Sequence, residues 1–121
     1  VKQPVYAKGN VYLNGAGVYE RECNCYVSHE NPHISLTEEE DGIYLELDVT
    51  PEMISVPTEI ITTETLGMVR IAEAPYETPQ GGRLVFDTDY HGNIRTGEPK
   101  AGPFEGLKPG RNRIKVWEVQ K

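Results

Sequence analysis

The residues with the clearest chemical potential lie in one stretch near the end of the sequence, positions 87–98. Aligned with a twelve-residue calcium loop, the stretch places Asp87, Asp89 and Glu98 at positions one, three and twelve, where such loops carry carboxylates. Position five is His91, however, and its imidazole replaces the oxygen ligand that calcium prefers. A calcium site is therefore one interpretation, and no other cofactor is expected.

The same stretch also suits a structural turn. Arg95 would place a positive charge beside the cation, whereas Asp87 or Asp89 could pair with it and accept hydrogen bonds from backbone amides. Strand-like residues precede the stretch and Pro99 follows it, so neither flank has the helical pattern of a calcium-binding hand. We expect a turn that needs no metal, with calcium as the alternative.

Other patterns that could indicate catalysis are either excluded by neighbouring residues or absent from the sequence. His29 to His33 matches the letters of the zinc-protease pattern, but Pro32 removes the helix that must place both histidines on one face. The sequence also lacks a Gly-x-Ser-x-Gly elbow and a glycine-rich phosphate loop. We assign no catalytic residue and do not expect the chain to be an enzyme by itself.

Three aromatic residues are candidates for sugar contact. Trp117 is expected to share a strand face with Arg113 and Lys115, where an indole between two cations could stack on a sugar ring. Tyr44 and Tyr90 are the other two candidates. The alternative is that Trp117 covers a core edge or packs against a neighbouring domain.

Size and charge narrow the class of protein. A chain of 121 residues with 37% hydrophobic residues can form one domain around one core. The net charge of −7 disfavours nucleic acid and anionic membranes as partners. We find no membrane-spanning apolar run and no signal peptide, and the first residue, Val1, indicates a fragment of a larger protein. Cys23 and Cys25 are expected to be free thiols, because residues two apart in a strand suit a disulfide poorly.

The hydrophobic pattern predicts an all-β domain. Apolar residues alternate from Ile43 to Val49, which is typical of a half-buried strand, and an acidic loop over 37–42 predicts a hairpin with a long turn. Thr50 followed by Pro51 predicts a single helical turn. Further strands are predicted at 11–13, 59–63, 68–72, 83–86 and 113–119. Glycine- and proline-rich turns between short strands favour a small β-sandwich or terminal β-helix coils.

Several motifs together resemble a known family. They are Lys8 to Ala16, Ile43 to Leu45, Thr62 to Gly67, Asp87 to Arg95 and Gly102 to Glu105. They resemble the C-terminal region of secreted bacterial right-handed parallel β-helix proteins, the pectate-lyase-like carbohydrate-active superfamily.

The resemblance implies that residues 1–121 are a single non-catalytic accessory domain that caps an extracellular or periplasmic β-helix protein. Its partners would be the preceding β-helix domain of the same chain and, in the alternative of a carbohydrate-binding module, a polysaccharide. The parent protein would be a polysaccharide lyase or glycoside hydrolase, with its catalytic residues outside this chain. The segment after Lys108 departs from the family pattern and adds a strand.

Overall fold

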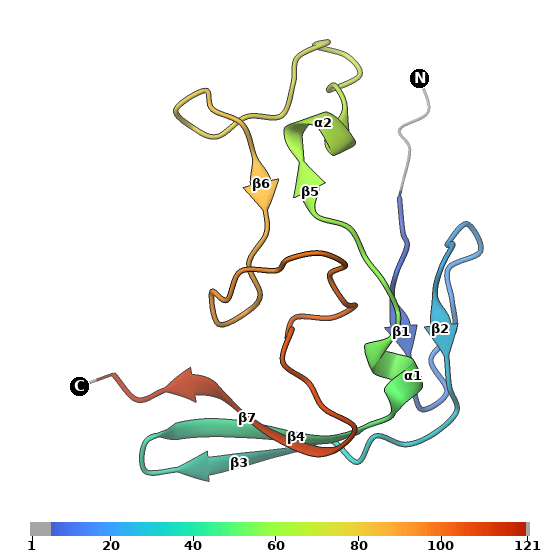
Figure 1. The fold of residues 1–121 in the computed structure, drawn as a ribbon, viewed down its shortest axis with the longest axis vertical. Helices are drawn as coiled ribbons and strands as arrows, with labels where there is room; N and C mark the ends of the chain where they lie inside the picture. Colours follow the sequence, from blue (N-terminus) through green and yellow to red (C-terminus); the bar gives the residue numbers. More distant parts are fainter. Residues whose placement is uncertain (1–5, 121) are drawn as a thin grey trace.

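The computed structural model describes residues 6–120; Val1, which prompted the prediction of a fragment, lies outside them. The chain is all-β, as predicted, and its strands form three separate small sheets arranged as an open frame (Figure 1). The elements in chain order are β1 (Val11–Tyr12), β2 (Tyr26–Val27), β3 (Ser35–Glu39), β4 (Gly42–Val49), α1 (Pro51–Ile54), β5 (Ile61–Thr62), α2 (Thr63–Leu66), β6 (Val85–Phe86) and β7 (Gly110–Glu118).

The largest sheet has three antiparallel strands in the order β3-β4-β7. The predicted hairpin is confirmed, because β3 and β4 pair over the whole of β3. The predicted long acidic turn is wrong, since β3 continues to Glu39 and only Glu40 and Asp41 connect the strands. Glutamates are compatible with β3 because it is an edge strand open to water.

The alternation along β4 gives this sheet two chemically different faces. The mainly apolar face carries Leu36 of β3, Ile43, Leu45, Leu47 and Val49 of β4, and Ile114 of β7, together with two polar residues, Glu38 opposite Ile43 and Asn112 opposite Leu47. The polar face carries Thr37 of β3, Tyr44, Glu46 and Asp48 of β4, and Arg111, Arg113 and Lys115 of β7.

A β-bulge in β7 changes which residues share these faces. Tyr44 pairs with Lys115, whereas Ile43 pairs with Trp117, so Val116 is an additional residue in β7. Cross-strand partners share a face, and Trp117 therefore lies on the apolar face with Ile43. The expectation that Trp117 shares a face with Lys115 and its basic neighbour is wrong, because simple alternation takes no account of a bulge.

Each of the other two sheets has two short strands: β5 and β6 pair antiparallel, and β1 and β2 form a parallel pair. β1 and β2 pair residue for residue, and the parallel bridge between Lys8 and Cys23 extends the pair at the same offset. The chain therefore makes one turn of a coil and returns beside itself in register (Figure 1). A turn at Asn14 and Gly15 follows β1, with the amide of Ala16 donating to the carbonyl of Leu13 at 3.0 Å. β2 was not predicted.

Of the two helical turns, α1 was predicted and α2 was not. The Thr50 side chain accepts a hydrogen bond from the amide of Met53, and a proline occupies the first turn of α1. α2 begins where the 59–63 strand was expected to end, because Thr62 and Thr65 form a reciprocal capping box. The strand predicted at 68–72 is a loop, in which Ile71 is 81% exposed. The loop is closed by an isolated antiparallel bridge between Met68 and Pro75, and the amide of Val69 donates to the carbonyl of Ala74 at 2.8 Å.

The core of the chain is small. The buried apolar residues in the described part are Val49, Met53 and Val56. The accessible surface is 8770 Å², compared with about 6,600 Å² for a compact monomer of this mass. The chain therefore exposes roughly a third more surface than its size requires, much of it apolar.

Candidate functional site

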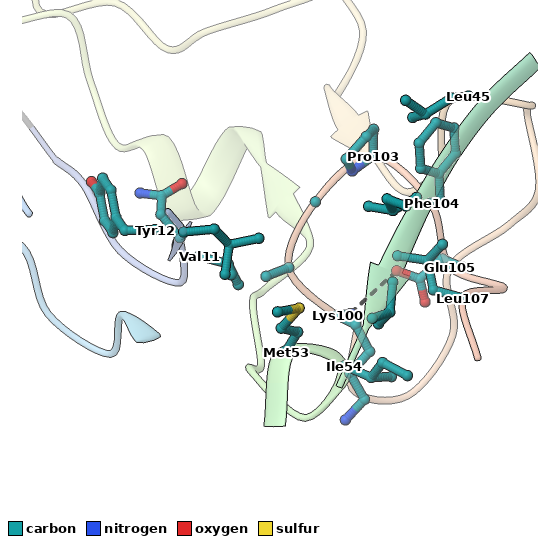
Figure 2. A pocket seen from close by; sticks show the side chains of 16 residues that line it. Val11, Tyr12, Leu45, Met53, Ile54, Lys100, Pro103, Phe104, Glu105 and Leu107 are labelled. Carbon is teal, nitrogen blue, oxygen red and sulfur yellow. Dashed lines mark hydrogen bonds between the residues drawn. The ribbon is translucent and has the colours of Figure 1, made fainter. Parts of the chain in front are cut away.

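An apolar cavity of about 540 Å³ lies between β4, α1, β1 and the 100–107 segment (Figure 2). Its apolar lining comes from Val11, Leu13, Leu45, Leu47, Val49, Met53, Ile54, Pro103, Phe104 and Leu107. Polar groups reach it from Asn10, Lys100 and Glu105. A hollow of this composition suits apolar side chains better than a charged substrate.

One wall of the cavity is held by a partly buried ion pair. The Arg95 guanidinium lies 3.0 Å from the Glu105 carboxylate and donates to the carbonyls of Lys100 at 3.0 Å and Gly102 at 2.7 Å. The Glu105 carboxylate also accepts from the amide of Lys100 at 3.2 Å, the contact drawn in Figure 2. These bonds tie the 100–105 loop to Arg95 and close it on itself.

Asp89 is the centre of the neighbouring turn and is only 8% exposed. Its Oδ1 accepts from the amides of His91 at 3.0 Å and Asn93 at 2.9 Å, and its Oδ2 accepts from the amide of Glu105 at 3.2 Å. Burial disfavours the charged carboxylate, but the donated hydrogen bonds outweigh it and hold the pKa of Asp89 below its usual value. Asp89, Arg95 and Glu105 thus form one structural unit, the Asp89 cluster.

The Asp89 cluster supports the structural turn, and whether the stretch also binds calcium stays a prediction. The predicted capping of amides by Asp89 is present, but the partner of Arg95 is Glu105, ten positions away. Asp87 contributes its carbonyl, which accepts from the Arg95 amide at 2.6 Å, and Glu98 is exposed. Residues 6–120 contain no group of three or more His, Cys, Asp or Glu side chains that could hold a metal ion.

Tyr90 and His91, next to Asp89, cover the free edge of β7. The Tyr90 hydroxyl donates to the carbonyl of Val116, and the His91 ring Nε2 lies 2.7 Å from the carbonyl of Lys115. Both rings also contact Phe104, with centroids 5.6 Å apart in each case. An unpaired strand edge attracts other strands, so these side chains protect β7 from unwanted pairing.

The three aromatic candidates for sugar contact are not brought together. Tyr44 lies on the polar face, where the Arg113 guanidinium stacks 3.7 Å from its ring centroid. Tyr90 lies at the edge of β7 and is 59% exposed, while Trp117 lies on the apolar face and is 50% exposed. Whether any of them contacts a glycan stays a prediction.

Three further residues singled out by sequence are His33, Cys23 and Cys25. His33 of the zinc-protease-like motif lies with its Nδ1 2.9 Å from Asp48, whose pKa is lowered, first by Arg111 and also by His33. Cys23 and Cys25 are both free. No helix in the described part of the chain is long and apolar enough to cross a membrane.

Comparison with known proteins gives one informative match. No protein-family model matches the chain, and neither does any curated protein. A solved structure described as "The complex structure of XylC with xylose" matches 97% of the chain, with a TM-score of 0.86 and 41% sequence identity. The chain spans 18% of the length of that XylC chain. The match supports the all-β fold and links the chain to a carbohydrate-related protein.

Proposed function

We propose that this chain is a non-catalytic accessory domain that caps an extracellular carbohydrate-processing protein and packs against a preceding β-helix domain of the same polypeptide. The observation that carries the proposal is the XylC match, in which nearly all of this chain corresponds to a minor part of a much longer protein. Since that structure is a complex with xylose, the parent protein would act on a xylose-containing glycan, as a glycoside hydrolase or a polysaccharide lyase.

The β1-β2 coil supports the position of the domain next to a β-helix. A β-helix stacks coils through parallel pairs at a constant offset, which is the relation between β1 and β2. Within the described residues β1 pairs with β2 alone, so its other edge is open to a preceding coil. The open cavity beside β1 and the excess surface are consistent with a chain that completes its core against a neighbour.

A truncation experiment tests this function. The full-length polypeptide and a version lacking these 121 residues would be assayed for sugar release from xylo-oligosaccharides and for Tm. We expect the truncated protein to retain the chemistry per folded molecule but to show a lower Tm and more aggregation, because an end of the coil stack is uncovered. Xylo-oligosaccharide cleavage by the 121-residue chain alone would contradict the proposal.

The second candidate is a carbohydrate-binding module that uses Trp117, Tyr90 or Tyr44. The half-exposed indole of Trp117 and the xylose in the matched structure favour it. Titration of the full-length protein and of its Trp117→Ala variant with xylo-oligosaccharides tests this second candidate. Trp117 is suitable for the test because it lies outside the region predicted to be catalytic. A loss of one binding event in the variant would favour the module over simple capping.

A further inference from the structure

Burial along β3 is inverted relative to the chemistry of its side chains. Leu36, on the apolar face, is 68% exposed, whereas Ser35 and Thr37 on the opposite face are half-buried. An antiparallel sheet with one face on a core shows the reverse pattern. The chain therefore does not itself cover the apolar face at the β3 side of the sheet.

The uncovered apolar surface crosses all three strands. Ile34, just before β3, is 61% exposed, and Trp117 on β7 is 50% exposed. The cross-strand pairs connect these positions through the Leu36–Leu45–Ile114 row and the Ile43–Trp117 pair. We call this surface the docking band, and it consists of Ile34, Leu36, Ile43, Leu45, Ile114 and Trp117.

The opposite face of the sheet shows what a water-facing surface of this chain looks like. Ion pairs cross it between Arg111 and Asp48 at 3.1 Å and between Arg113 and Glu39 at 3.0 Å. Lys115 lies 2.8 Å from Asp41 on the same side. Because this polar face satisfies its own charges, the docking band is the face of the sheet that lacks a partner.

We infer that the docking band packs against the neighbouring domain of the same polypeptide, with Trp117 as its anchor; the inference rests on the proposed function. The band continues into the apolar cavity through Leu45, and the cavity is lined by Val11 and Leu13 around β1. A neighbour that extends the coil at β1 therefore also reaches the band. Over the whole chain the accessible surface of 8770 Å² exceeds that of a compact monomer by about 2,200 Å², which leaves room for an interdomain interface of ordinary size.

Two other occupants fit the band less well. A second copy of the chain would bring together the acidic residues Glu38, Glu39 and Glu40 of β3 and its turn, at a net charge of −7 per chain. A glycan needs hydrogen-bonding groups beside an aromatic ring, whereas the cross-strand neighbour of Trp117 is the aliphatic Ile43 and the carboxylate of Glu38 belongs to the strand beyond it. A large aromatic side chain next to aliphatic ones, with charge at the margin, is typical of a protein interface.

Hydroxyl-radical footprinting of the full-length polypeptide tests the inference. We expect Trp117 and Leu36 to react several-fold more slowly than their exposure in the isolated chain would allow. The Leu36→Glu variant should restore the reactivity of Trp117, because a carboxylate within the interface is unpaired. Thr37→Glu is the matched control: it adds the same charge one residue along β3, on the face with Arg113 and Lys115, and should leave Trp117 protected.

Each alternative has its own signature. Full reactivity of Trp117 in the wild-type polypeptide, or protection that persists in Leu36→Glu, overturns the inference. Protection that disappears on dilution assigns the band to a second copy, and protection that appears only with added xylo-oligosaccharide assigns it to a glycan. If the proposed function is wrong but the docking inference is right, the result differs from all of these: Trp117 stays protected in a polypeptide that processes no carbohydrate.

Discussion

The Asp89 cluster lies in the turn whose Tyr90 and His91 cover the edge of β7, whereas the docking band includes residues of β7 itself, and the two regions are completed in opposite ways. In the cluster, the buried carboxylate oxygens of Asp89 and the guanidinium of Arg95 are each satisfied by groups of this chain. In the band, Leu36 and Trp117 remain half or more exposed. The chain thus organises its polar turn alone and leaves part of its apolar surface uncovered.

This difference indicates that the Asp89 cluster and the docking band have different roles. Buried polar groups cost free energy unless they are hydrogen-bonded, so the Asp89 cluster must be complete before any partner is present. The hydrophobic effect is not directional, so exposed apolar surface can be buried later by another chain or domain. The cluster therefore positions the 100–105 loop and the edge of β7, and the docking band supplies the area for association.

Asp89→Ala is expected to produce the largest loss of stability. The amides of His91, Asn93 and Glu105 would lose their acceptor in a buried position. Thermal unfolding of the full-length protein should show a clear fall in Tm. Asp87→Ala is the control, since the Asp87 carbonyl rather than its side chain accepts the Arg95 amide; an equal fall in both variants would contradict the distinction.

Met53→Ala should cost about 2 kcal/mol of unfolding free energy, near the low end for a buried methionine. Met53 is 8% exposed but lines a cavity that is already open, so less packing is lost than in a closed core. Urea unfolding of the full-length protein measures the change. Met53→Leu conserves volume and should cost less than about 1.5 kcal/mol. A larger cost for Met53→Leu than for Met53→Ala would be inconsistent with simple cavity lining.

Calcium titration should give no heat from the 87–98 stretch. Both carboxylate oxygens of Asp89 face N–H donors, which present positive charge where a cation would have to lie. The same titration of Asp89→Asn in the full-length protein is the control. A binding event in the wild type that disappears in this variant would restore the calcium interpretation with Asp87, Asp89 and Glu98.

The smallest effect is expected at the exposed pair of Glu64 and Arg83. The Arg83 guanidinium, with further hydrogen bonds, lowers the pKa of Glu64 from 4.5 to about 2. The folded-state pKa is depressed, so the stabilisation is present above pH 4.5 and is lost as the pH falls towards 2. Glu64→Gln should slightly reduce the change in Tm with pH across that interval. An unchanged pH profile in the variant would show that the pair contributes nothing measurable.

Local patterns predicted the part of the fold that local forces determine. The alternation from Ile43 to Val49 predicted β4, and Thr50 with Pro51 predicted α1, because each depends on neighbouring residues only. β2 could not be predicted, since its two residues become a strand only beside β1. The loop at Ile71 shows the converse, where strand-like residues turn back after a single bridge between Met68 and Pro75 and do not extend into a strand.

The candidate site was less predictable for the same reason. The turn at Asp89 was anticipated, but pairing between Arg95 and Glu105 depends on a loop that folds back over ten positions. The cavity collects residues from four separate segments, and no pattern within one segment indicates it. Trp117 was assigned to the charged face because the bulge at Val116 depends on the register with β4.

The additional residue at Val116 decides from which side of the sheet the indole is presented. Deleting it would close the bulge and leave Trp117 directly after Lys115, so plain alternation would keep the indole opposite Ile43. If β7 kept its length but lost the bulge, the indole would instead project on the side of Arg113 and Lys115. The largest aromatic side chain of β7 is therefore oriented by an irregularity of the backbone and not by the order of residues alone.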